Sequence, residues 1–276
     1  MHLTRTLWLA IVGLAALTQT PSAHAEDLTI PGSGNPEFVL EQLAKAFNSQ
    51  QSAHRVTVPK STGTAGALRD VEAGVASIGR VGRPLKDDEK ARGLSYLALG
   101  RDPVVFAAGA GVTAQGITAA QVVDVYSGKT TDWRELGAKP GPIRAIGREV
   151  TDASRQAVAR HVAAFGSVVY GENVKLVHLD PQLIELLDRY PTSLCFINQS
   201  ALSAAKTKPV RLAFDGIEPT AENLEKGRYP MWLDFGLVYK AGQLTPGGKA
   251  FLAFAQSPAV TQLLRQHGVL PAAAPR

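Results

Sequence analysis

The sequence predicts an α/β fold, and three observations lead to this class. Short β-like runs alternate with amphipathic helices along most of the chain. Recognisable caps mark where several of the helices begin. Hydrophobic residues make up 45% and charged residues 19% of the 276 residues, as in an ordinary globular protein of one or two domains.

The first part of the chain opens with a predicted strand at 27–30, a glycine loop and a helix over 36–50. Asn35 is the expected N-cap of this helix and Pro36 its first residue. Apolar residues then recur at helical spacing, at Leu40, Leu43, Ala44 and Phe47. Further strands are expected at 54–58, 75–79 and 103–109, and a further helix at 68–73.

The later part of the chain continues the alternation. Thr118 and Gln121 form the capping box of the next helix, and Gly128 ends it. Asp180 is the expected N-cap of a helix that runs to 190. The remaining strands are expected at 142–147, 193–197, 209–214 and 232–240, and the remaining helices after 151 and over 245–256 and 257–268.

The first 25 residues have the three parts of a cleavable signal peptide. Arg5 lies in a short basic region, an apolar stretch covers 7–17, and Ala23-His24-Ala25 is an A-x-A cleavage site. The apolar stretch is too short to span a bilayer, and no cysteine follows it. We therefore expect an exported, periplasmic protein without a lipid anchor.

Charge and cysteine content exclude other classes. The formal net charge is +5, but the basic residues are scattered, which argues against nucleic-acid binding and leaves an anionic small ligand open. Cys195 is the only cysteine, so the chain has no internal disulfide. We expect it to be a small buried hydrophobic residue.

Three predicted strand–loop–helix junctions, at 32–34, 61–64 and 151–154, carry hydroxyls and small residues. Unpaired N–H groups and the helix dipole attract anions where a helix begins. Ligands of open α/β sheets bind at the carboxyl ends of strands, so the three junctions together predict an anion-binding cage. Each junction taken alone is also compatible with a plain helix cap.

Five longer segments occur in a characteristic order. They are GSGNPEF (32–38), STGTAGALRDVEAGVASIGRVGRPL (61–85), ITAAQVVDVYSGKTTDW (117–133), DGIEPTAENLEKGRYPMW (215–232) and AFLAFAQSPAVTQLLRQHGVLP (250–271). In this order they resemble the periplasmic phosphate-binding proteins of ABC transporters and the wider family of phosphate-binding-like solute receptors. The resemblance covers nearly all of the chain after the signal peptide.

The resemblance implies a two-lobed periplasmic binding protein fold of type II, with a ligand cleft between the lobes. The first lobe would hold residues 26–104 and 231–276, and the second lobe 105–230. It also implies a receptor that captures phosphate or a similar small oxyanion for an ABC transporter permease. We expect a monomer that needs no cofactor and no metal.

The family's ligand contacts carry over to positions in all three junctions. In the first two junctions these positions are Ser33, Gly34, Ser61, Thr62, Gly63 and Thr64. In the third, Arg148 matches the family's arginine and Ser154 stands at its threonine. An arginine there would bind an oxyanion bidentately. Arg80 and Arg83, at the end of a predicted strand, are expected near the cleft, with solvated surface arginines as the alternative.

The third junction also departs from the family pattern. Val150 replaces an acidic residue, Asp152 replaces a serine, and Gly82 stands where relatives place Ser or Asp. An acidic acceptor favours hydrogen phosphate over sulfate, because only the former has a proton to donate. Asp152 either takes over this role or caps its own helix, and both possibilities stay open.

These departures motivate a second hypothesis, a phosphate-binding-like protein that has lost phosphate affinity and binds another ligand or a periplasmic protein partner. An enzyme is a third hypothesis. The sequence has no H-E-x-x-H, C-x-x-C or G-x-S-x-G motif. His161 is expected to be packed or half-buried on its helix. We therefore expect a binding protein and no catalytic residues.

Overall fold

The computed structural model describes residues 26–273, so the predicted signal peptide lies outside the described residues. The strands are β1 (Glu26–Thr29), β2 (His54–Thr57), β3 (Ile78–Val81), β4 (Ser95–Ala108), β5 (Gly116–Ile117), β6 (Arg144–Arg148), β7 (Val174–Val177), β8 (Ser193–Asn198), β9 (Val210–Phe214), β10 (Trp232–Tyr239) and β11 (Leu270–Pro271). The α-helices are α1 (Glu37–Gln50), α2 (Gly63–Glu72), α3 (Asp87–Ala91), α4 (Ala119–Tyr126), α5 (Ala153–His161), α6 (Ala163–Gly166), α7 (Asp180–Arg189), α8 (Gln199–Leu202), α9 (Ala221–Glu225), α10 (Pro246–Ala255) and α11 (Pro258–Gln266). Two 3₁₀ turns within these residues are η1 (Trp133–Leu136) and η2 (Ala241–Gln243). In the described part of the chain, no helix has both the length and the apolar character that crossing a membrane requires.

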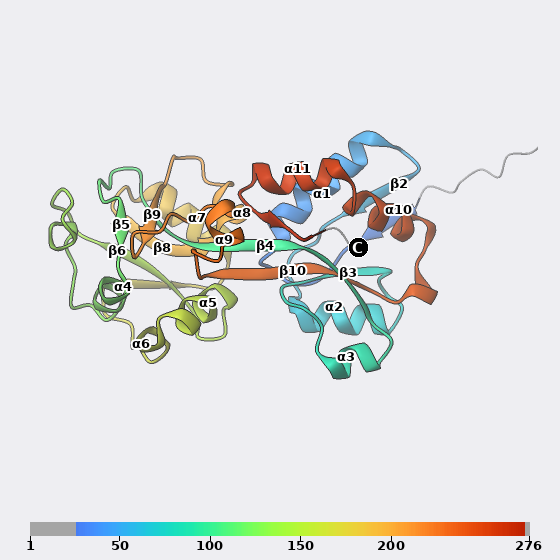
Figure 1. The fold of residues 1–276 in the computed structure, drawn as a ribbon, viewed down its shortest axis with the longest axis horizontal. Helices are drawn as coiled ribbons and strands as arrows, with labels where there is room; N and C mark the ends of the chain where they lie inside the picture. Colours follow the sequence, from blue (N-terminus) through green and yellow to red (C-terminus); the bar gives the residue numbers. More distant parts are fainter. Residues whose placement is uncertain (1–25, 274–276) are drawn as a thin grey trace, which may run out of the picture.

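Two strands, β4 and β10, run side by side along the molecule and join its two halves (Figure 1). β4 pairs antiparallel with β10 from Ser95 to Pro103, and then with β8 from Val104 to Ala108. Within residues 26–273, nine strands form one sheet whose main path is β3-β10-β4-β8-β6-β7. The chain therefore passes between the halves once in each direction, through neighbouring strands.

The first half has a core between the short parallel sheet β1-β2, the sheet around β10, and the helices α1, α10 and α11. The side chains that α1 buries include every member of the predicted stripe. Phe47 of α1 meets Phe251 of α10 edge to face, with ring centroids 5.3 Å apart. Burying one face of α1 in this way fixes the position of its N-terminus.

The second half packs α4, α5 and α6 against β4, β6 and β8 around an aromatic core. Phe106 of β4 stacks on Phe214 of β9 at 5.6 Å, and Phe196 of β8 meets Phe165 of α6 at 5.6 Å. α7 and α8 cover the other face of β8 with a smaller apolar cluster that includes Cys195. Cys195 is buried and free, as expected.

Most predicted elements are present, but the N-caps of α1 and α7 are Pro36 and Leu179, where the sequence predicted Asn35 and Asp180. Three expected bounds also need correction. β4 begins at Ser95, well before the predicted 103, because its first half pairs with the distant β10. α2 begins at Gly63, so the serine–threonine loop is itself the helix start. The helix expected after 151 breaks at Val162 into α5 and α6, and His161 is exposed at the break.

Candidate ligand cleft

A cleft of about 1540 Å³ lies between the two halves. Its first wall consists of the loop before α1, the start of α1, and the segments around Ser61 and Gly82. Its second wall consists of the segments that follow β6 and β7, together with α5 and α7. The start of β10 lines it as well, at Trp232, Leu233 and Asp234. The three junctions named from the sequence all reach this cleft.

The first wall presents two helix starts, those of α1 and α2, and at α2 the Ser61 hydroxyl accepts from the Gly63 N–H at 3.2 Å. The residue before α1 is Pro36 and the residue before α2 is Thr62, and neither accepts a capping hydrogen bond. Ser33 lies beside the α1 start, held by its N–H, which donates to Arg80 O at 3.0 Å. Two helix starts, with nearby hydroxyls, form a suitable surface for an anion.

Gly32 allows the loop before α1 to pack directly against β3. Its φ is 140°, a left-handed conformation that favours glycine, and a Cβ there would lie 2.0 Å from Arg80 O. The glycine at this position therefore brings the loop before α1 and β3 into direct contact.

Arg80 does not line the cleft, which corrects the expectation from the sequence. Its side chain is fully buried and donates to the carbonyl oxygens of Ile30, Ser33 and Pro59. Its Nη2 also donates to Glu37 Oε2 at 2.9 Å. Burial lowers the pKa of Arg80, although Glu37 opposes the shift. Arg80 thus holds the first wall together from behind.

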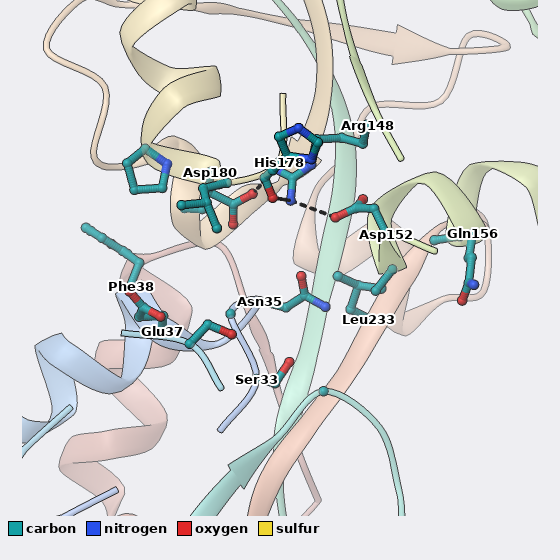
Figure 2. A pocket seen from close by; sticks show the side chains of 18 of the residues that line it. Ser33, Asn35, Glu37, Phe38, Arg148, Asp152, Gln156, His178, Asp180 and Leu233 are labelled. Atoms are coloured by element: carbon teal, nitrogen blue, oxygen red, sulfur yellow. Dashed lines mark hydrogen bonds and ion pairs between the residues drawn. The ribbon is translucent and has the colours of Figure 1, made fainter. Parts of the chain in front are cut away.

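The second wall is organised around Arg148, the last residue of β6 (Figure 2). Its Nη1 donates to Asp180 Oδ1 at 2.5 Å, and its Nη2 donates to Asp152 Oδ2 at 2.7 Å and to His178 O at 3.1 Å. Figure 2 shows Ser33, Asn35 and Glu37 on the other side of the cleft from this group. We call Arg148, Asp152 and Asp180 the arginine–carboxylate group.

Burial and ion pairing shift the pKa values of Arg148 and Asp180 in opposite directions. Burial alone would lower the pKa of Arg148, but Asp180 and Asp152 outweigh it and raise that pKa. Burial raises the pKa of Asp180, and Asp152 adds to this, while Arg148 opposes it. Arg148 therefore stays charged, and the group carries one negative charge in excess when both carboxylates are ionised.

Asp152 caps its own helix, one of the two possibilities that the sequence left open, and it also lines the cleft. Its Oδ1 accepts a hydrogen bond from the Arg155 N–H at 3.0 Å, so it caps α5. Its Oδ2 pairs with Arg148, and the residue lines the cleft. The start of α5 is thus occupied by a carboxylate of its own, unlike the starts of α1 and α2. Arg155 is buried.

Of the residues predicted from the sequence, the structure brings seven to the cleft and leaves four outside it. Ser33, Gly34, Ser61, Thr64, Arg83, Arg148 and Asp152 line the cleft. Thr62, Gly63, Arg80 and Ser154 do not line it. Ser154 is buried on another face of α5, because the residues of that helix that line the cleft are Ala153, Gln156, Ala157, Arg160 and His161. Arg83 is half-buried at the edge, where its guanidinium bonds bidentately to Glu89 at 2.8 and 2.7 Å.

Asp180 is the most important cleft residue that sequence reasoning missed. The sequence indicated only that it begins a helix, and it is the first residue of α7. It reaches Arg148 because β6 and β7 are parallel neighbours, with Arg148 beside Val177. β7 was not predicted, so nothing in the sequence placed Asp180 beside the third junction. Glu37, Asn35 and Lys60 also line the cleft and were not predicted.

A buried polar cluster connects the two walls behind the cleft. Asp102 of β4 accepts hydrogen bonds from the Ser200 N–H at 3.1 Å, from Asn198 Nδ2 at 2.9 Å and from the Ser200 hydroxyl. Asn198 Nδ2 also reaches Asn35 O at 3.1 Å. Burial raises the pKa of Asp102 to about 6, despite the hydrogen bonds from Ser200 and Asn198. This cluster thus links the loop before α1 to the crossing strand.

Within residues 26–273, no group of three or more His, Cys, Asp or Glu side chains is arranged to hold a metal ion. The cleft offers hydroxyls, N–H groups, one buried guanidinium and the carboxylates beside it. Such a set can bind a small oxyanion and accept a hydrogen bond from it.

Comparison with known proteins agrees with this geometry. A family model described as a PBP superfamily domain matches residues 17–259. The phosphate-binding protein PstS of Bacillus subtilis is 22% identical over 273 residues, which cover 94% of this chain and 87% of PstS. PstS 2 of Streptococcus pneumoniae is 27% identical over 120 residues, covering 43% of this chain and 40% of the relative.

Solved structures show the same architecture. A putative phosphate ABC transporter substrate-binding protein from Clostridium perfringens, with bound phosphate, superposes with a TM-score of 0.75 at 25% identity, covering 90% of this chain and 100% of that one. An ABC-type phosphate transport receptor from Vibrio cholerae gives a TM-score of 0.63 at 20% identity, covering 88% and 99%. The chain belongs to the PBP superfamily and has its two-lobed α/β fold with a cleft between the lobes.

Proposed function

We propose that this protein captures phosphate in the cleft and delivers it to the permease of an ABC transporter. One observation carries the proposal: two helix starts without a capping carboxylate on one wall lie across the cleft from a buried arginine on the other. The names of the relatives, which are phosphate-binding proteins and phosphate transport receptors, support it.

The first wall would hold the phosphate oxygens. The N–H groups at the starts of α1 and α2 and the hydroxyls of Ser33, Ser61 and Thr64 are the donors we assign to this role. Arg148 would bind from the second wall. Its Nε is buried and has no hydrogen-bond partner among the described residues, so the guanidinium retains an unused donor.

Asp152 and Asp180 would supply the acceptor that Val150 and Gly82 cannot. An ionised carboxylate accepts a hydrogen bond from hydrogen phosphate but repels sulfate, which has no proton to offer. Both carboxylates lie at the cleft and are fixed by Arg148. On this view, the departures of the third junction move the acceptor to new positions, and phosphate selectivity is retained.

We further infer two lobes, residues 26–104 with 231–276 and residues 105–230, joined through β4 and β10. At about 1540 Å³, the cleft is larger than typical ligand pockets, which is consistent with an open state that closes by hinge motion. The leader predicted at 1–25 supports export to the periplasm. We infer a monomeric binding protein without catalytic activity.

Calorimetric titration of the chain from Glu26 onward with phosphate tests the proposal, with sulfate as the control anion. We expect one phosphate per chain and binding of sulfate at least about a hundredfold weaker, since rejection of a ligand that leaves buried polar groups unpaired is strong. Absence of phosphate binding would refute the phosphate assignment. Release of phosphate from a chromogenic ester would refute the absence of catalysis.

A further inference from the structure

A single tyrosine hydroxyl holds the main chain of Arg148 at the end of β6. Tyr170 lies between α6 and β7. Its hydroxyl donates to Arg148 O at 3.0 Å and accepts from the Arg148 N–H at 3.3 Å. Both main-chain polar groups of Arg148 are therefore bound by one group from a segment 22 residues away.

Arg155 completes this arrangement from α5. Its Nη1 donates to the same Arg148 O at 3.0 Å, and its Nη2 donates to Val168 O at 3.2 Å. The guanidinium lies 4.3 Å from the centroid of the Tyr170 ring and 5.9 Å from that of Phe165. A cation over an aromatic face is attracted to it, so Arg155 and Tyr170 fix one another.

The charges in this region balance. Arg148 and Arg155 carry two positive charges beside the two carboxylates of Asp152 and Asp180. Burial raises the pKa of Tyr170, with Arg155 opposing the shift, so its hydroxyl stays protonated and remains a donor at neutral pH.

Gly147 shows how closely the ring is fitted to the strand. A Cβ at this position would lie 2.5 Å from Tyr170 Cε2 and 2.8 Å from Cζ. Only glycine admits the tyrosine ring against β6 here. The residue before Arg148 and the residue that holds Arg148 are therefore matched to one another.

We propose that Tyr170 and Arg155 are positioning residues: they fix the main chain of Arg148 so that its guanidinium meets the ligand from a set position. The inference rests on the proposed function, in which Arg148 binds the anion. Tyr170 does not line the cleft, so its effect on binding has to pass through Arg148.

Tyr170→Phe tests the inference, with Tyr126→Phe as the matched control. The Tyr126 hydroxyl donates to Ile146 O at 3.1 Å. The control therefore also removes a tyrosine hydroxyl that bonds to the main chain of β6, but this hydroxyl does not bond to Arg148. We expect the two variants to have similar melting temperatures. We expect Tyr170→Phe to weaken phosphate binding about tenfold, as when the supporting partners of a ligand-binding group are lost, and Tyr126→Phe to leave binding within about twofold.

Repeating both substitutions in an Arg148→Lys background separates a positioning role from a structural one. Lysine keeps the charge but not the guanidinium, so Tyr170→Phe should have no further effect on phosphate affinity there. Unchanged affinity of Tyr170→Phe in the wild-type background would overturn the inference. So would an equal loss of affinity in both backgrounds.

A ligand-free measurement distinguishes failure of this inference from failure of the proposed function. The NMR signal of the Arg148 Nε–H should shift in Tyr170→Phe and stay in place in Tyr126→Phe, without any phosphate. An unmoved signal would refute the positioning role even if the wild type binds phosphate. A wild type that binds no phosphate, with the signal shifted in Tyr170→Phe, would refute the proposed function and leave Arg148 positioned by Tyr170.

Discussion

Arg148 and Asp180 meet at 2.5 Å although 32 residues separate them. Arg148 ends β6, and Asp180 begins the helix that follows β7, the parallel neighbour of β6. Asp152 contacts the same guanidinium from α5. One arginine therefore orders two carboxylates at the cleft, and the predictions below begin with this group.

Asp180→Asn should reduce selectivity for phosphate over sulfate. The amide keeps the shape of the side chain but loses the charge that rejects sulfate and accepts the phosphate proton. Loss of one charge-assisted hydrogen bond, about 1.5–3 kcal/mol, corresponds to a phosphate affinity about 10- to 100-fold lower. Titration calorimetry with both anions measures the change.

Asp188→Asn is the control for this substitution. Asp188 lies on the same helix and lines the cleft, but its carboxylate binds Thr207 and the Lys206 N–H. Its anion selectivity should match the wild type. If both variants lose selectivity equally, the effect is general to cleft charge and Asp180 has no special part in it.

Arg148→Met should destabilise the fold at pH 7 by about 3 kcal/mol, because it leaves two buried carboxylates without their partner. Burial already raises the pKa of Asp180 in the folded state, and loss of Arg148 raises it further. A carboxyl whose folded pKa exceeds its unfolded pKa costs stability when ionised. The deficit should therefore shrink as the pH falls and Asp180 protonates.

Urea unfolding at pH 7 and pH 4.5 measures this deficit. Arg189→Met is the control, since Arg189 pairs with Glu185 on the exposed side of α7. Removing an exposed pair should change the free energy of unfolding by less than about 1 kcal/mol. A deficit for Arg148→Met that is the same at both pH values would contradict the expected protonation of Asp180.

Asp102→Asn should flatten the pH dependence of stability between about pH 4 and 6. The pKa of Asp102 rises to about 6 in the folded state, from 3.8 as the ordinary value. The folded protein thus binds the proton more tightly than the unfolded chain does. The contribution of Asp102 to the free energy of unfolding therefore falls as the pH rises through that window, and it is constant above it. The shift corresponds to about 3 kcal/mol.

Unfolding free energies of wild type and Asp102→Asn at intervals from pH 4 to 7 test this prediction. The difference between the two proteins isolates Asp102 from carboxyls with the opposite sign. Glu89 is one of these, because the Arg83 hydrogen bonds lower its pKa to about 2. Parallel curves for the two proteins would mean that Asp102 does not titrate in this range.

Trp232 should report ligand binding through its fluorescence. It lines the cleft at the start of β10, opposite Pro103 on the crossing strand, with Arg101 5.2 Å from its ring centroid. Closure of the lobes would change its solvent contact. Trp133, the other tryptophan of residues 26–273, is buried in the second half.

Phosphate titration should therefore change the fluorescence emission of the wild type and leave that of Trp232→Phe nearly unchanged. Trp133→Phe should retain the full response. A response that persists in Trp232→Phe would mean that the signal comes from the second half and that Trp232 does not sense closure.

Local signals in the sequence predicted most of the fold. Caps such as Thr118 with Gln121 and apolar stripes such as that of α1 depend on near neighbours, and both are present. The first half of β4 was missed because its state depends on pairing with β10, more than 130 residues later. Its 95–103 segment includes exposed positions and a glycine, so no strand pattern is visible in the sequence alone.

The candidate cleft was predicted only in part, because some of its residues also come together through contacts that are distant in sequence. The loop before α1 and Arg148 have local motifs, and both line the cleft. Asp180 and Tyr170 have none, because each meets Arg148 only after β6, β7 and α6 have packed. Arg80 was misplaced because a strand end predicts proximity to the cleft but not the direction in which a side chain points.

The position of β10 between β3 and β4 has a consequence for the order of folding. The central strand of the first half is among the last parts of the chain to be synthesised, and everything from Gly109 to Met231 precedes it. The second half is nearly continuous in sequence and can assemble from local contacts. Long-range pairing is slow, so the first half should fold last. The loop before α1 should reach its final position only after the C-terminal segment has packed.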